Sequence, residues 1–197
     1  MNKIEKLAEL KKEVLKCNKC KLATHRTNVV FGEGNPDGGI MLIGEGPGAE
    51  EDKTGRPFVG KSGKLLDKIL EAIGLNREDN VFIANIVKCR PPNNRVPEKD
   101  ERNACLPYLH KQIEIINPKI IVLLGATALK LIDEKRKLNE IKGEWIIWKG
   151  KIVLTTNHPS ALLRNPNLKN EAWTHFKKVF QKYREVINPN HTSNYIK

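Results

Sequence analysis

The sequence predicts an α/β fold in which helices cover both faces of a parallel sheet, and two observations support this prediction. Short runs of purely apolar residues alternate along the chain with longer segments of helical periodicity, a pattern typical of parallel strands buried on both sides. Each apolar run also ends in a loop rich in Gly, Pro, Asn or His. The carboxyl ends of parallel strands share one edge, where open α/β sheets bind ligands. We therefore expect three loops far apart in the sequence to meet in one cleft.

Apolar periodicity and turn residues define the individual elements. Helical spacing of apolar residues predicts helices, continuous apolar runs predict strands, and Gly74 and Pro118 mark two helix ends. The elements expected in order are a helix over 2–16, an extended piece over 29–34, a strand over 40–43, a helix over 62–73, a strand over 81–87, a helix over 97–117, a strand over 119–124, a helix starting at 125, a hairpin of strands over 145–148 and 151–155, and a helix over 171–186.

Composition limits the classes of protein that the chain can belong to. At 197 residues it is expected to be a single domain over 1–197, with a polar and frayed tail over 188–197. The excess of 35 Lys+Arg over 23 Asp+Glu gives a net charge of +12, which favours nucleic acid as a partner over a merely solvated basic surface. No apolar run is long enough to cross a membrane and no signal-peptide core is present, so a cytoplasmic protein is expected. The abundance of Lys and Ile is compatible with a thermophilic source.

The segment from Ile40 to Gly63 is the first candidate ligand site. Gly44, Gly46 and Gly48 keep side chains out of the loop, so backbone amides can approach a bound group, and Phe58 offers a large flat face. The alternative is that Gly-Pro-Gly is only a tight exit from a strand.

The four cysteines form a second candidate site. Cys17 and Cys20 make a CxxC motif, and Cys89 and Cys105 complete a set of four thiolates. Such a set suits a [4Fe-4S] cluster or a structural zinc ion, and the spacing does not separate the two. Unrelated buried thiols are the remaining alternative.

Residues 157–164 form a third candidate site. His158 follows a predicted strand, where its ring can donate a hydrogen bond to a developing anion. Leu162, Leu163 and Arg164 then make an apolar finger tipped by a cation, which could wedge between bases while Arg164 pairs with phosphate. Alternatively, His158 is structural and the leucines start a core helix.

These motifs together resemble the iron–sulfur (family 4) uracil-DNA glycosylases of thermophilic bacteria and archaea. The resemblance covers Cys17 to about Phe180 and rests on Gly44–Gly48, Gly55–Gly60, Asn85, Lys88–Pro92, Asn94–Arg95 and His158–Arg164. It implies a three-layer α/β/α sandwich around a four-stranded parallel sheet. It also implies a [4Fe-4S] cluster held by the four cysteines, with a structural role because glycosidic hydrolysis needs no redox step.

The resemblance implies an enzyme that hydrolyses the N-glycosidic bond of deoxyuridine in single- or double-stranded DNA. The absence of an obvious lysine nucleophile from the pocket loops predicts a monofunctional enzyme that leaves an abasic site for base excision repair. Phe58 would stack on the flipped uracil, Asn85 would read its edge, and His158 would donate to O2 of the leaving base. The backbone from Gly44 to Gly46 would hold the base, and Leu162, Leu163 and Arg164 would occupy the gap left in the duplex.

The sequence departs from the family's pattern at the positions expected to assist catalysis and to reject thymine. An aspartate of better-known uracil-DNA glycosylases corresponds here to Gly46, so Glu45 and Asn94 are the expected catalytic helpers. Ala49 replaces a common acidic residue, and Glu51 is the expected residue for rejecting thymine. A monomer in a prokaryotic cytoplasm, associated with the nucleoid, would follow.

Two other classes of protein compete with this expectation. One is a non-catalytic nucleic-acid-binding protein with structural zinc at the four cysteines. The other is a nucleotide-binding α/β enzyme, which is disfavoured because neither GxGxxG nor GxxxxGK[ST] occurs.

Overall fold

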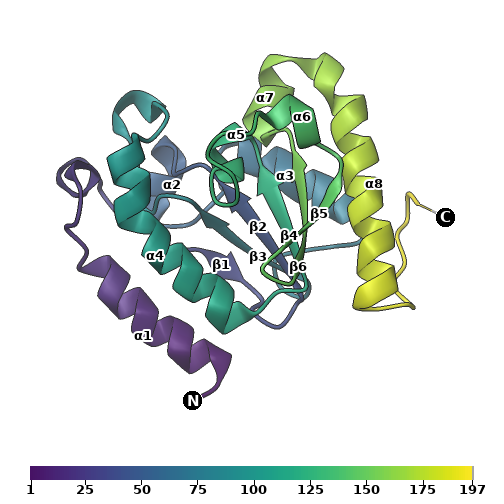
Figure 1. Ribbon diagram of the computed structural model, residues 1–197, viewed down its shortest axis with the longest axis horizontal. Helices are drawn as coiled ribbons and strands as arrows, with labels where there is room; N and C mark the ends of the chain where they lie inside the picture. The colour runs from purple at the N-terminus through teal and green to yellow at the C-terminus, as the bar shows by residue number, and fades with distance from the viewer. Residues whose placement is uncertain (197) are drawn as a thin grey trace.

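The computed structural model describes residues 1–196 and contains one six-stranded sheet with the order β1-β3-β2-β4-β6-β5 (Figure 1). The four central strands pair in parallel, as predicted, while β1 and β5 add antiparallel strands at the two edges. The strands are β1 (Glu33–Gly34), β2 (Ile40–Gly44), β3 (Val81–Asn85), β4 (Ile120–Leu124), β5 (Trp145–Trp148) and β6 (Lys151–Thr156).

Helices cover both faces of this sheet, which confirms the three-layer arrangement. Helices α1 and α4 pack on one face, and α3 and α8 pack on the other (Figure 1). The α-helices are α1 (Lys3–Leu15), α2 (Ala49–Thr54), α3 (Lys61–Ala72), α4 (Lys99–Ile116), α5 (Ala126–Leu129), α6 (Leu138–Ile141), α7 (Pro159–Arg164) and α8 (Lys169–Val186), and the 3-10 helices are η1 (Lys21–Thr24), η2 (Pro92–Asn94) and η3 (Pro166–Leu168). None of the helices within 1–196 has the length and apolar character needed to span a membrane.

The continuous apolar runs of the strands supply two separate halves of the core. In β2, Met41 and Ile43 pack under α1 and α4, whereas Ile40 and Leu42 pack under α3 and α8. Successive side chains of a strand point to opposite faces, so a strand between two helical layers must be apolar at every position. All five residues of β2 are buried for this reason.

The register of the parallel strands brings their carboxyl ends to one edge. Gly44 at the end of β2 pairs with Asn85 at the end of β3. In the other half of the strand order, Leu124 at the end of β4 pairs with Thr156 at the end of β6. The loops that follow these strands therefore start side by side.

Two short helices occupy segments that were expected to be loops. Helix α2 lies inside the glycine-rich segment, where Glu51 accepts a hydrogen bond from the amide of Gly48 at 3.1 Å and closes the first turn. Acidic residues at positions 50–52 favour a helix N-terminus at this point, a signal present in the sequence. Helix α7 contains the predicted finger, which agrees with the alternative that the leucines start a helix.

The C-terminal tail, expected to be frayed, makes contacts with the body of the protein in its described part. The hydroxyl of Ser193 donates to the carbonyl of Ala72 at 2.6 Å, and the ring of His191 lies 4.8 Å from that of Tyr183. Nε2 of His191 also lies 3.1 Å from the carbonyl oxygen of Ile73. The ends of α3 and α8 thus hold residues 188–196 in place, while the last predicted tail residue, 197, lies outside the described residues.

Candidate active site at the carboxyl edge of the sheet

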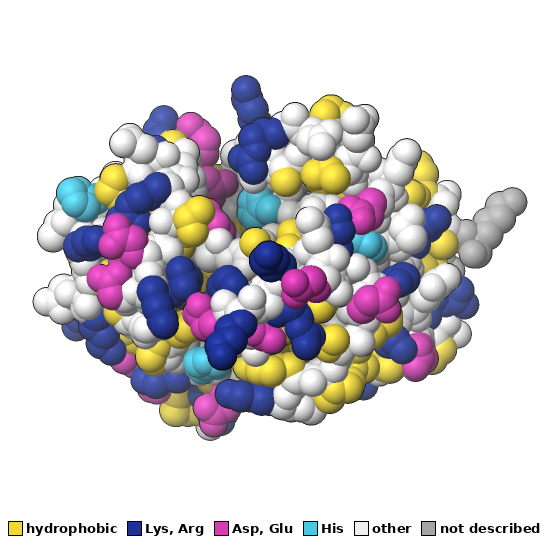
Figure 2. Space-filling model, turned by 45° about the horizontal axis from the view of Figure 1, so that its top comes forward, with side chains coloured by type: hydrophobic (Ala, Val, Ile, Leu, Met, Phe, Trp, Pro, Cys, Tyr) yellow, Lys and Arg dark blue, Asp and Glu magenta, His cyan; other side chains and the backbone are white. Residues whose placement is uncertain are grey.

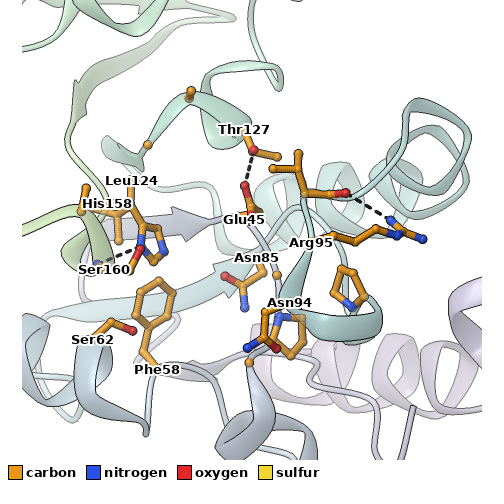
Figure 3. A pocket seen from close by; sticks show the side chains of 18 of the residues that line it. Glu45, Phe58, Ser62, Asn85, Asn94, Arg95, Leu124, Thr127, His158 and Ser160 are labelled. Atoms are coloured by element: carbon orange, nitrogen blue, oxygen red, sulfur yellow. Dashed lines mark hydrogen bonds between the residues drawn. The ribbon is translucent and has the colours of Figure 1, made fainter. Parts of the chain in front are cut away.

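The loops after the four parallel strands enclose a cavity of about 590 Å³, called here the edge cavity. In Figure 2 the molecule is hollowed at this edge, with a histidine side chain inside and Lys and Arg side chains around the rim. The predicted convergence of the strand-end loops is confirmed. Residues that border the cavity include Glu45, Gly46, Glu51, Phe58, Asn85, Asn94, Arg95, Thr127, His158, Ser160 and Arg164 (Figure 3).

Phe58 presents an aromatic ring to the edge cavity from the loop before α3 (Figure 3). The side chain is 4% exposed, and its ring centroid lies 5.5 Å from that of His158 at an interplanar angle of 32°. The backbone of Phe58 has a φ of 52°, in the left-handed region that a bulky residue rarely adopts. The ring is therefore held beside His158 by a loop with an unfavourable backbone conformation.

Asn85 is the last residue of β3, and its amide points to the edge cavity (Figure 3). The residue is 1% exposed, and within 1–196 its Oδ1 is buried without a hydrogen-bond partner. Buried polar atoms in native proteins nearly always have a partner, so this acceptor is available to a donor group that enters the edge cavity.

Glycines leave the space that these two side chains occupy. A Cβ at Gly44 would lie 2.5 Å from Cζ of Phe58 and 2.6 Å from Oδ1 of Asn85. Gly46 borders the cavity, and a Cβ there would lie 2.8 Å from Val87. Gly44 thus serves the packing of Phe58 and Asn85, a reason for this glycine that the sequence did not reveal.

His158 is fixed in one tautomer by the start of α7. The amide of Ser160 donates to Nδ1 of His158 at 3.1 Å, so the neutral ring carries its hydrogen on Nε2. Burial, with a smaller contribution from the positive charge of Arg164, lowers the pKa of His158 to about 4. At neutral pH the side chain is an uncharged donor through Nε2.

Glu45 and Thr127 form a pair that only the structure reveals. The hydroxyl of Thr127, on α5 after β4, donates to Oε2 of Glu45 (Figure 3). The backbone carbonyl of Glu45 also accepts from the amide of Val87 at 3.1 Å. A carboxylate at the edge cavity is therefore oriented by a side chain of α5, and no motif in the sequence marks Thr127 as its partner.

Asn94 and Arg95 border the edge cavity from the segment after β3. Oδ1 of Asn94 accepts from Nε of Arg90 at 2.8 Å, and the residue has a φ of 55°. Arg95 makes two hydrogen bonds, of 2.7 and 2.8 Å, to the buried carboxylate of Glu101 on α4. The loop that carries Asn94 is in this way anchored to α4.

Glu51, the residue expected to reject thymine, accepts main-chain hydrogen bonds from two loops of the cavity wall, one before α2 and one before α3. Its carboxylate receives the amides of Gly48 at 3.1 Å, Val59 at 2.9 Å and Gly60 at 2.8 Å. The side chain is 8% exposed and borders the cavity. Its position fixes the spacing of the two loops.

The predicted DNA-contacting finger is corrected by the burial of one of its members. Leu162 is 1% exposed, whereas Leu163 is 45% exposed and Arg164 borders the edge cavity. Helical geometry in α7 turns adjacent side chains to different sides, so Leu162 packs inward. Leu163 and Arg164 alone face outward.

The four cysteines line a second, smaller cavity between the end of α1, η1, α4 and the segment after β3, called here the cysteine cavity. Nη1 of Arg26 donates to Sγ of Cys89 at 3.2 Å, and the amide of Lys88 donates to Sγ of Cys105 at 3.3 Å. Burial raises the pKa of the Cys105 thiol to about 11. Neighbouring cations and amides of this kind stabilise bound thiolates.

The donor set of the cysteine cavity fits an iron–sulfur cluster. No three His, Cys, Asp or Glu side chains within 1–196 converge closely enough to bind one metal ion. A four-iron cluster takes one thiolate at each iron, so its ligands lie further apart than the four ligands of a single zinc ion. Four thiols that line one cavity are a donor set that such a cluster can use.

Lys88 connects the two cavities. Its side chain is 1% exposed, and its ammonium donates to the backbone carbonyl of Asn85 at 2.9 Å and to the amide oxygen of Gln112 at 2.6 Å. Burial lowers the pKa of Lys88 to about 8. The same residue thus contacts Cys105 through its amide and the end of β3 through its side chain.

A family model described as the uracil DNA glycosylase superfamily matches residues 31–183, which include every residue of the edge cavity described above. The chain belongs to this superfamily. It is 51% identical over 186 residues to a type-4 uracil-DNA glycosylase of Sulfurisphaera tokodaii, covering 89% of this chain and 84% of the relative. It is 55% identical over 165 residues to the type-4 uracil-DNA glycosylase of Thermotoga maritima, covering 82% of this chain and 85% of the relative.

A more distant relative within the superfamily shows how specific this similarity is. A type-5 uracil-DNA glycosylase of Pyrobaculum aerophilum is 33% identical over 141 residues, covering 62% of each chain. The type-4 relatives match at higher identity over more of the chain, so the chain is a member of the type-4 uracil-DNA glycosylases.

Proposed function

We propose that the protein is a monofunctional uracil-DNA glycosylase that hydrolyses the N-glycosidic bond of deoxyuridine, in single- or double-stranded DNA. The products are free uracil and an abasic site, which base excision repair then processes. The observation that carries this proposal is the unpaired, buried Oδ1 of Asn85 beside the ring of Phe58. A planar base with an N–H at its edge would supply a donor to Oδ1 of Asn85 and a flat face to the ring of Phe58.

Phe58 and Asn85 would recognise the base together. The nucleotide must leave the base stack before its glycosidic bond becomes accessible, and Phe58 would stack on the extruded uracil. Oδ1 of Asn85 would accept from N3–H, and Nδ2 would donate to O4. Cytosine presents the opposite pattern at these two atoms and would lose both hydrogen bonds. Glu51 would set the width of the pocket beside C5 through its bonds to both loops.

His158 would stabilise the leaving base. As the bond between C1′ and N1 breaks, its electron pair moves onto the base and negative charge develops at O2. Nε2–H of the neutral ring would donate to O2 without giving up its proton, since the pKa of His158 is about 4. A single donor of this type lowers a barrier by roughly 3 kcal/mol.

Glu45, held by Thr127, would orient the attacking water and stabilise positive charge on the sugar. The water oxygen bonds to C1′ and the proton that it loses passes to solvent, while the released uracil anion takes up one proton from solvent at N1. Asn94 would assist from the other wall of the edge cavity. Leu163 and Arg164 would contact the DNA at the rim, and the net charge of +12 would favour binding to the phosphate backbone.

Cys17, Cys20, Cys89 and Cys105 would hold a [4Fe-4S] cluster in the cysteine cavity. When bound, this group would cross-link the segment after α1, α4 and the segment after β3. Its role would be structural, because hydrolysis needs no electron transfer. The protein would act as a monomer on chromosomal DNA in a prokaryotic cytoplasm.

An oligonucleotide with one central uracil tests the proposed reaction. We expect release of uracil and strand cleavage only after alkali is added, with no reaction on matched oligonucleotides that carry thymine or cytosine. Cleavage without alkali would contradict a monofunctional enzyme, and an unreacted uracil strand would contradict the activity.

The colour of the purified protein tests the cofactor independently. A [4Fe-4S] protein is brown and absorbs near 400 nm, whereas a colourless protein with bound zinc would favour the non-catalytic alternative.

A further inference from the structure

The backbone of Phe58 requires a support that the edge cavity itself does not provide. Its φ of 52° costs on the order of 1–3 kcal/mol for a non-glycine residue, and such a conformation persists only where the surroundings hold it. Gly63 on α3 contributes by leaving room, since a Cβ there would lie 1.9 Å from the carbonyl oxygen of Phe58. Space alone does not hold the loop, so a donor to its carbonyls is needed.

The guanidinium of Arg77 is that donor. Nη1 donates to the carbonyl of Pro57 at 2.6 Å, and Nη2 donates to the carbonyl of Phe58. The side chain of Arg77 is 14% exposed and does not border the edge cavity. Arg77 therefore contacts the main chain of the loop from outside the edge cavity.

Two carboxylates fix the orientation of this guanidinium. Nε of Arg77 donates to Oδ1 of Asp67 on α3 at 2.8 Å, and Nη1 donates to Oε1 of Glu33 on β1 at 2.8 Å. A planar guanidinium can serve several acceptors in fixed directions, whereas the ammonium of lysine acts as a point charge. The loop of Phe58 is thereby tied to the edge of the sheet and to α3 through one side chain.

We propose that Arg77 is a positioning residue that holds the ring of Phe58 in the orientation that stacks on uracil. This inference rests on the stacking role proposed for Phe58. Arg77 touches no substrate and acts only through the carbonyls of Pro57 and Phe58. Its contribution is therefore expected to vanish when Phe58 has no ring to position.

The test uses Arg77→Lys and Arg77→Gln, with Arg56→Gln as the matched control. Arg56 also pairs with Glu33, at 2.8 and 3.0 Å, but its side chain is 63% exposed and its guanidinium makes no described hydrogen bond to either carbonyl. We expect both Arg77 variants to lower kcat/KM on uracil-containing DNA and to raise the inhibition constant of free uracil about tenfold or more. Affinity for uracil-free DNA and all constants of Arg56→Gln should stay within about twofold of the parent protein.

A double-mutant cycle with Phe58→Ala separates positioning from a general structural role. Arg77→Gln should add less than about twofold to the loss caused by Phe58→Ala. Independent, multiplicative losses would overturn the proposal, as would equal losses in Arg77→Gln and Arg56→Gln. If Phe58→Ala alone leaves uracil inhibition and turnover unchanged, the stacking role of Phe58 fails, which is a distinct outcome from a failure of Arg77.

Asp67→Asn gives a milder version of the same test should Arg77→Gln fold poorly. Asp67 has a side chain that is 49% exposed, so its substitution loosens Arg77 at the surface while the two carbonyl bonds remain possible. We expect a smaller rise in the uracil inhibition constant, of about two- to fivefold, that again disappears in the Phe58→Ala background. The proposal would be overturned if Asp67→Asn left the uracil inhibition constant unchanged and Arg77→Lys behaved like the parent protein.

Discussion

Asn85→Leu should strongly reduce the activity of the protein without making it less stable. Leu has nearly the shape of Asn, but it removes the buried Oδ1 that has no partner within 1–196. A buried polar atom without a hydrogen bond destabilises a protein by about 1–3 kcal/mol. For a chain of this length, 1 kcal/mol corresponds to about 2–4 °C in Tm. We therefore expect Tm to stay constant or to rise by several degrees.

The same substitution should strongly reduce catalysis. Uracil would lose its partners at N3–H and O4, and each group left unpaired in a closed pocket costs about 1–3 kcal/mol. The combined loss of about 2–6 kcal/mol corresponds to a decrease in kcat/KM by a factor of about 30 to about 10⁴. Thermal unfolding and the uracil-release assay on the same preparation measure both quantities.

Asn157→Leu is the matched control. Asn157 is 6% exposed and also borders the edge cavity, but its Nδ2 donates to Oε2 of Glu171 at 3.0 Å. Its replacement breaks an existing hydrogen bond, so Tm should fall. The reasoning is refuted if Asn85→Leu lowers Tm as much as Asn157→Leu does, or if Asn85→Leu keeps the activity of the parent protein.

Three further predictions concern His158 and Thr127. His158→Ala should lower kcat by about 10² to 10³ while affinity for uracil-containing DNA stays nearly unchanged, as measured by single-turnover kinetics and titration, and an equal loss in both would assign His158 to binding. The pKa of His158, about 4 in the folded protein, lies below the ordinary value of 6.5, so the unfolded chain takes up a proton at a higher pH than the folded one does. The free energy of unfolding should therefore fall as pH drops from 6.5 to 4, by about 3 kcal/mol from this group, and denaturant titrations of His158→Gln should lack that share of the decrease. Thr127→Val should lower kcat by about tenfold because it releases Glu45, whereas Thr127→Ser, which keeps the hydroxyl, should retain most of the activity; equal losses in the two variants would show that packing, not the hydrogen bond, is what matters.

Elements with a single dominant pattern could be predicted from the sequence. The runs at 40–43 and 120–124 are apolar at every position because helices cover both faces of the sheet, so both are recognisable in the sequence as buried parallel strands. Convergence of the loops followed from this, because parallel strands end at one edge. Phe58, Asn85 and His158 were therefore found as neighbours although they are far apart in the sequence.

Features that depend on one side chain meeting another could not be predicted in this way. The pattern Ala-Leu-Leu-Arg is compatible with both an exposed finger and a helix, and only packing turns Leu162 inward. Thr127 becomes part of the site because α5 places its hydroxyl beside Glu45. The carbonyl contacts of Arg77 involve backbone atoms, which leave no trace in residue types.

The order of the strands along the chain divides the residues of the edge cavity into two groups. Phe58 and Asn85, which are proposed to recognise the base, come from the part of the chain up to β3, whereas His158 follows β6. A cut in the connection between Ile116 and Ile120 would yield one fragment with Phe58 and Asn85 and another with His158. Neither fragment holds a complete site, so glycosylase activity after mixing would report reassembly of the parallel pairing between β2 and β4. The enzyme thus provides its own complementation assay.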